Sequence, residues 1–128
     1  MKKSIYWIPF SIYSLVLMRL LLSPSYELSS FLVEQDDKLL HSIAFAVLIF
    51  LYLLAITHFF CKSELKPQLL LVGFFILSMT GGILEILQKF VPGRKTSISD
   101  FWFNNLGLAT GLLLFLALKH LLKLFKKH

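Results

Sequence analysis

Four long apolar stretches constrain this chain more than any other feature of its sequence. They cover about residues 4–22, 39–60, 67–90 and 101–122. A helix of roughly 20 mostly apolar residues is long enough to cross the hydrocarbon core of a bilayer. No strand-like alternation of apolar and polar residues competes with this pattern. The sequence therefore predicts an all-α, polytopic membrane protein, a bundle of four transmembrane helices in a single domain over residues 1–128.

The composition supports the same class. Of the 128 residues, 57% are hydrophobic and 16% are charged, which is too little polar surface for a water-soluble domain of this size. The formal net charge of +6 could indicate nucleic-acid binding, but the basic residues lie at the ends of the apolar stretches, as in membrane topology. We therefore expect the lipid bilayer, and no nucleic acid, as a partner. The single cysteine, Cys61, excludes an internal disulfide.

The first 25 residues resemble a secretory signal peptide, because Lys2 and Lys3 precede an apolar stretch. That stretch is longer than the roughly 7–15 apolar residues of a signal peptide, and no A-x-A-like cleavage site follows it. We therefore expect an uncleaved first helix, with a cleaved signal as the alternative.

The basic residues predict the orientation of the helices. With four spans, eight of them fall on one side of the membrane: Lys2, Lys3, Lys62, Lys66, Lys119, Lys123, Lys126 and Lys127. Four fall on the other side: Lys38, Lys89, Arg94 and Lys95. Since the more basic side of a membrane protein usually faces the cytoplasm, we expect cytoplasmic N- and C-termini. The links at 23–38 and 91–99 then face outward.

Polar residues form a stripe on each of three predicted helices, because residues three or four apart share a helix face. The stripes are Asp37 and His41, with Lys38 beside them; Gly81, Glu85 and Gln88; and Asp100, Asn104, Gly107 and Gly111. The polar members all lie near the predicted outer ends of their helices, so we expect them to meet at one membrane level. The glycines would allow close helix packing.

Glu85 is the residue that is hardest to explain by structure alone. At 1.5 Å per residue, it lies roughly 7 Å inside the predicted helix end at Phe90. An ionised carboxylate that faces lipid at this depth would cost on the order of 2–3 kcal/mol or more. We therefore expect Glu85 to face the interior of the bundle, near His41, Lys38 or Arg94.

Each of the other polar residues also has a purely structural interpretation. Asp100 could cap its helix, with Ser97 and Ser99 as rivals for that position. Gln88 could bridge two helices, and His41 could be an interface histidine. Arg94, Asp37 and Lys38 could simply be solvated. Because three stripes align on one side of the membrane, we favour a shared site.

The ordered set of these residues resembles the VanZ-like family. The pattern consists of Asp37-Lys38-x-x-His41, Glu85-x-x-Gln88, Arg94 and Asp100-x-x-x-Asn104-x-x-Gly107-x-x-x-Gly111. The resemblance implies a small multi-pass protein of the bacterial cytoplasmic membrane, in a family named for a member linked to teicoplanin resistance. It implies no established reaction, and the cofactor is unknown.

Three functions remain open. The first is an outward-facing site that binds or processes an anionic or lipid-linked cell-envelope molecule, such as a precursor or a lipoglycopeptide. Its catalytic candidates are Glu85, His41 and Asp100. Its ligand-binding candidates are Asp37, Lys38, Gln88, Arg94 and Asn104. The second is a non-enzymatic helix-bundle scaffold that assists a partner. The third is a metal-binding membrane enzyme with Asp37, His41, Glu85 and Asp100 as ligands, although no motif such as H-E-x-x-H is present.

Overall fold

The computed structural model describes residues 4–24, 37–59 and 65–126, with the side chains of Asp37, His58 and Phe59 outside the description. The elements are the short 3-10 helix η1 (Ser4–Tyr6), α1 (Trp7–Leu21), α3 (Asp37–Phe59), α4 (Pro67–Gln88) and α5 (Ile98–Phe125). Four helices are long and apolar enough to cross a membrane, the first formed by η1 with α1. The predicted all-α bundle of four transmembrane helices is confirmed, and the chain is a multi-pass membrane protein.

Local sequence explains where α4 and α5 begin. Pro67 is the first residue of α4, where its missing N–H costs no intrahelical hydrogen bond. α5 begins at Ile98 rather than at 101, because the extended residue Ser97 caps it. Between the two helices the chain turns at Gly93, whose φ of 75° is in the left-handed region that favours glycine.

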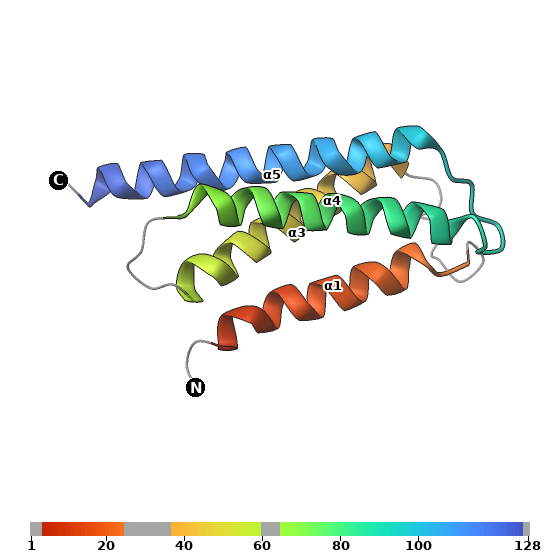
Figure 1. Cartoon of the computed structure of the whole chain (residues 1–128), viewed down its shortest axis with the longest axis horizontal. Helices are drawn as coiled ribbons and strands as arrows, with labels where there is room; N and C mark the ends of the chain where they lie inside the picture. Colours follow the sequence, from red (N-terminus) through yellow and green to blue (C-terminus); the bar gives the residue numbers. More distant parts are fainter. Residues whose placement is uncertain (1–3, 25–36, 60–64, 127–128) are drawn as a thin grey trace.

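The four helices run lengthwise beside one another, with both chain termini at the same end of the bundle (Figure 1). At the opposite end α1 and α4 finish, and α3 and α5 begin. We call this the Gly93 end, after the link between α4 and α5. It therefore gathers the last turns of two helices and the first turns of two others.

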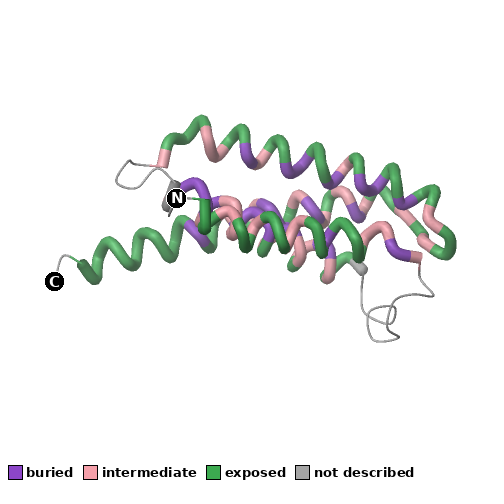
Figure 2. Tube along the Cα trace, turned by 90° about the horizontal axis from the view of Figure 1, so that it is seen from below, coloured by how far each residue is buried: buried purple, intermediate pink, exposed green. Residues whose placement is uncertain are grey.

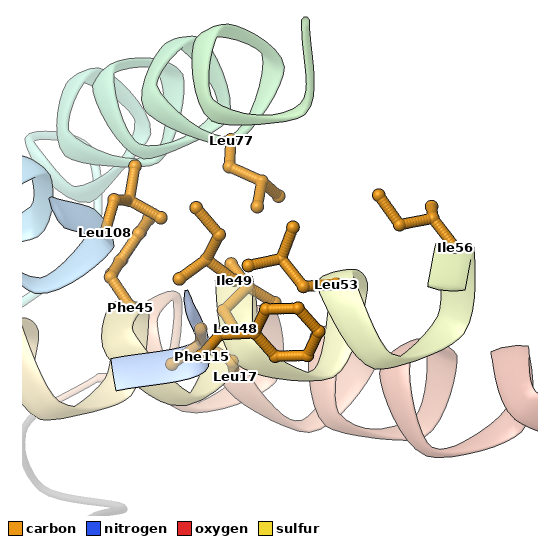
Figure 3. Packing of buried hydrophobic residues seen from close by; sticks show 9 residues of the cluster. All are labelled: Leu17, Phe45, Leu48, Ile49, Leu53, Ile56, Leu77, Leu108 and Phe115. Carbon is orange, nitrogen blue, oxygen red and sulfur yellow. The ribbon is translucent and has the colours of Figure 1, made fainter. Parts of the chain in front are cut away.

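α3 supplies most of the core. Its fully buried side chains include Phe45, Ile49 and Leu53, and they pack with apolar side chains of the other three helices (Figure 3). α3 lies closest to α5, where Gly107 and Gly111 face it. A Cβ at Gly107 would collide with the backbone carbonyl of Ser42, and one at Gly111 with that of Ala46. The two glycines therefore allow the α3 and α5 backbones to touch.

The outward surface of the bundle is apolar, and Figure 2 shows which parts of the helices are exposed. Large hydrophobic side chains such as Leu71, Phe75 and Leu113 are exposed along its length. In water such a surface would be a large aggregation-prone patch, whereas lipid solvates it. Every residue of α5 from 116 to 125 is exposed, and the C-terminal end of α5 extends past the other helices (Figure 2).

Candidate functional site

Three helices bring buried polar side chains together at the Gly93 end. His41 comes from the beginning of α3, Glu85 from the last turn of α4, and Asp100 and Asn104 from the beginning of α5. His41, Glu85 and Asp100 are each 7% exposed, and Asn104 is 1% exposed. We call these four residues the polar cluster. Burying so many polar groups is costly unless each finds a partner.

His41 is the centre of the polar cluster. Its Nδ1 lies 2.8 Å from Asn104 Oδ1 and 3.6 Å from Glu85 Oε1. Because an amide oxygen can only accept, Nδ1 carries a hydrogen and donates it to Asn104. The contact with Glu85 is longer than a good hydrogen bond, so the carboxylate is close to the imidazole without being bonded to it.

Glu85 is incompletely satisfied. Its Oε2 is buried and has no hydrogen-bond partner among the residues that the structure describes. An unsatisfied buried acceptor costs about 1–3 kcal/mol, and more if it is charged. The polar cluster therefore has room for a donor or a cation that the described protein groups do not supply.

Asp100 has two roles in the geometry. It is the third residue of α5, and its Oδ2 accepts a hydrogen bond of 3.2 Å from the N–H of the N-cap residue Ser97. Ser97, not Asp100, is thus the N-cap. Asp100 also comes close to the other two ionisable side chains. One ring nitrogen of His41, one carboxylate oxygen of Glu85 and one of Asp100 all lie within 4.8 Å of one another.

A pocket of about 280 Å³ connects Glu85 to the surface between the end of α4 and the start of α5. We call it the α4–α5 pocket; its walls are formed by Gly82, Glu85, Ile86, Lys89, Thr96, Ser97, Ile98 and Phe101. Glu85 thus belongs both to the buried polar cluster and to an open pocket. The pocket lies at the Gly93 end, and the exposed Lys89 is the basic residue in its wall.

Gln88 and Arg94 hold the end of α1 in place. Gln88 Nε2 donates to the carbonyl of Leu21 at 2.8 Å. Arg94 donates from Nε to the carbonyl of Ser23 at 3.0 Å and from Nη2 to that of Leu20 at 2.6 Å. The last carbonyls of a helix lack intrahelical donors, so Gln88 supplies a donor to Leu21. Arg94 adds a second donor at Leu20, whose carbonyl also accepts the N–H of Ser23 at 3.3 Å.

The remaining candidates lie on the periphery. The Lys38 ammonium lies 5.8 Å from the centre of the Phe103 ring, a cation–π distance. The side chain of Asp37 lies outside the described residues. Gly81 faces the interior, where a Cβ would meet the Phe45 ring at 3.0 Å and Asn104 Nδ2 at 3.4 Å.

Sequence reasoning missed two polar residues of this region, Ser42 and Asn105. Ser42 Oγ donates to the carbonyl of Phe103 at 2.9 Å, which ties α3 to α5. Asn105 Oδ1 accepts from Ser78 Oγ at 2.6 Å, which ties α4 to α5. Ser78 extends the stripe of Glu85 by one helical turn, but Asn105 belongs to no stripe. Only its position beside Asn104 could have drawn attention to it.

The family model described as VanZ/LLP1 matches residues 2–120 of the chain. The chain belongs to the VanZ/LLP1 family. No curated protein and no solved structure matches it. The match covers the four membrane helices except for the last residues of α5, and it includes every residue of the polar cluster. The predicted VanZ-like membership is confirmed, and teicoplanin resistance is an association at the level of this family.

Proposed function

We propose that this VanZ/LLP1 protein binds the phosphate-bearing head of a lipid-linked cell-envelope molecule in the α4–α5 pocket. The observation that carries the proposal is Glu85, a buried carboxylate with an unsatisfied oxygen that is nevertheless part of an open pocket wall. A residue that only packed helices together would be paired inside the bundle, away from such an opening. A hydroxyl or other hydrogen-bond donor on the head of the ligand would give Glu85 the partner that it lacks, with the phosphate nearer to Lys89.

The pocket offers two attractions for an anion. Lys89 can form a charge-assisted hydrogen bond with a phosphate oxygen. Ser97 and Ile98 mark the beginning of α5, and the first amides of a helix carry partial positive charge that favours phosphate. One attraction comes from Lys89, the C-cap of α4, and the other from the beginning of α5.

The pocket also suits a lipid-linked molecule. Ile86, Ile98 and Phe101 form apolar parts of its wall, and the large apolar side chains of Phe90 and Trp102 are exposed nearby in the sequence. A polyprenyl or acyl chain could therefore remain in the bilayer while its head enters the pocket. The distribution of lysine and arginine favours a Gly93 end that faces out of the bacterial cytoplasmic membrane. The ligand is then a molecule of the outer leaflet, which includes envelope precursors and the acyl chain of a lipoglycopeptide.

If a reaction occurs, proton transfer is the chemistry that the polar cluster supports best. Glu85 would act as the acid or base, with His41 adjacent and Asp100 close to both. The family membership supplies no reaction, so binding is the part of the proposal that is tested first.

The test uses Trp102 as a reporter. The chain has two tryptophans, so Trp7→Phe leaves Trp102, next to the pocket residue Phe101, as the single fluorophore. In lipid nanodiscs, titration with a polyprenyl phosphate should change its fluorescence, whereas the uncharged polyprenol should not.

Lys89→Ala should weaken this binding about tenfold or more, since a hydrogen bond to a charged group contributes roughly 1.5–3 kcal/mol. Lys119→Ala, an exposed lysine near the other end of α5, is the matched control and should bind like the wild type. Equal responses to the phosphate and the alcohol, or equal affinities of the two variants, would rule the proposal out.

A non-enzymatic scaffold is the second candidate, and one observation favours it for part of the site. The side-chain donors of Gln88 and Arg94 are directed to the carbonyls at the end of α1. For these two residues we favour a structural role over direct ligand contact. The scaffold would account for the whole site only if Glu85→Gln changed stability and left ligand binding intact.

A further inference from the structure

We propose that His41, Glu85 and Asp100 bind one divalent transition-metal ion, Zn²⁺ or Mn²⁺, at the inner wall of the α4–α5 pocket. The inference deepens the proposed function and rests on it, because the ion would stand between the protein and the phosphate of the ligand. Asp37, whose side chain lies outside the described residues, is not part of the proposed site.

The separation of the side chains fits a shared ion. One nitrogen and two carboxylate oxygens, from three different helices, lie within 4.8 Å of one another. His41 Nδ1 and Glu85 Oε1 are 3.6 Å apart, too far for a good hydrogen bond. Two ligand atoms bound to one tetrahedral Zn²⁺ at about 2.0–2.1 Å lie roughly 3.3 Å apart, so only a small adjustment separates the observed pair from a ligand pair.

An independent observation points to a missing cation. Glu85 Oε2 has no hydrogen-bond partner among the described residues. Water does not supply one readily either, because Glu85 is only 7% exposed. Asn104 Oδ1, which lies 2.8 Å from His41 Nδ1, offers a further neutral oxygen. Binding of the ion at Nδ1 would require the tautomer that carries its hydrogen on Nε2, so the hydrogen now donated to Asn104 would move to the other ring nitrogen.

The ion would also resolve an electrostatic conflict. Glu85 and Asp100 place two carboxylates beside a pocket that we propose for an anion, and like charges repel. With neutral His41, a divalent ion cancels both carboxylate charges, and Lys89 then leaves the pocket positive. One imidazole with oxygen donors suits Zn²⁺ or Mn²⁺ better than the all-oxygen sites that Ca²⁺ prefers. An open position on the ion, directed to the pocket, would take a phosphate oxygen or a water.

The experiment measures metal uptake alone. The full chain, carrying an affinity tag without histidines, is purified in detergent, stripped with a chelator and titrated with ZnCl₂, MnCl₂ or MgCl₂. We expect one equivalent of Zn²⁺ or Mn²⁺ and an unfolding temperature that rises with metal concentration. Glu85→Gln and Asp100→Asn should each weaken uptake by at least about tenfold, since changes even in the outer shell of a metal site cost 10–100-fold. His120→Ala, an exposed histidine of α5, is the matched control and should change nothing.

Two outcomes overturn the inference: no stoichiometric uptake by the wild type, or uptake by Glu85→Gln that equals that of the wild type. The helix content and unfolding temperature of each stripped variant are measured first, and Glu85→Gln keeps the size of the side chain, so loss of uptake can be separated from loss of fold. Titration with polyprenyl phosphate in the presence of the chelator separates the two proposals. Wild-type affinity for the phosphate under those conditions contradicts an ion that stands between the protein and the phosphate, and leaves the proposed function standing.

Discussion

Glu85 of α4 and His41 of α3 face each other across the bundle, with Oε1 3.6 Å from Nδ1, while the other carboxylate oxygen has no hydrogen-bond partner in the described part of the chain. This arrangement stabilises the bundle poorly. A buried pair repays the loss of hydration only when its geometry is good and its remaining lone pairs are satisfied. The arrangement therefore supports the ligand site that we propose more than a contact that only holds helices together.

Glu85→Gln should leave the protein folded, with an unfolding temperature equal to or higher than that of the wild type. The amide has the same shape, and it removes a carboxylate whose burial is not repaid. Thermal unfolding in detergent, followed by circular dichroism, measures the effect. Asn104→Ala is the comparison, because it removes a fully buried hydrogen-bond partner of His41 and should destabilise the fold by about 1–3 kcal/mol. A larger loss of stability in Glu85→Gln than in Asn104→Ala would mean that the carboxylate is structural.

Gly107→Ala should destabilise the bundle by about 1–3 kcal/mol, because the new methyl group would force the α5 backbone away from the Ser42 carbonyl. The matched control is Gly82→Ala on α4, where a Cβ would meet only the edge of the Phe101 ring, at 3.3 Å. A side chain can shift where a backbone cannot, so the control should stay within about 1 kcal/mol of the wild type. Equal unfolding temperatures for the two variants would show that α3 and α5 do not touch at Gly107.

Arg94→Ala should loosen the end of α1. The change removes two hydrogen bonds to the carbonyls of Leu20 and Ser23, and we expect a loss of about 1–3 kcal/mol. Hydrogen exchange should become faster near Leu22 and Ser23, whose amides donate to α1 carbonyls. Lys95→Ala, an exposed neighbour, is the control and should leave both the stability and the exchange rates unchanged. Unchanged exchange at the end of α1 in Arg94→Ala would contradict the role that we assign to the guanidinium.

The orientation of the chain can be tested with its single cysteine. If the termini are cytoplasmic, a membrane-impermeant thiol reagent added to intact cells should not label Cys61, which lies in a link on the same side. Lys95→Cys, introduced with Cys61→Ser, should be labelled, since 91–99 would face outward. The opposite labelling pattern would place the α4–α5 pocket at the cytoplasmic face.

The sequence predicts the helices, the level at which the polar residues lie and His41 as a neighbour of Glu85, but not the contacts of the residues around them. Four apolar stretches of this length predict four membrane-spanning helices, because in a bilayer the backbone groups of each segment must be hydrogen-bonded within their own helix. The spacing of Glu85 and of Asp100 with Asn104 places each on a helix face, and the structure brings these faces together with His41.

The contacts of Arg94 and Gln88 illustrate what the sequence could not provide. Their acceptors are backbone carbonyls at the end of α1, and every residue has such a carbonyl, so only the packing of α1 selects Leu20, Leu21 and Ser23. The pocket beside Glu85 likewise depends on how far α4 and α5 diverge. That distance is set by side chains on both helices, and no spacing within one helix encodes it.

The most direct test of the central claim is to map where a lipid-linked phosphate contacts the protein. A polyprenyl phosphate that carries a photoreactive group near its head would be irradiated with the wild-type protein in nanodiscs, and the labelled peptides would be identified by mass spectrometry. We predict cross-links in the last turn of α4 and the first turn of α5, around Lys89 and Phe101, that an excess of unlabelled polyprenyl phosphate removes. Cross-links spread evenly along the bundle, or concentrated at the end that holds the two termini, would contradict the account.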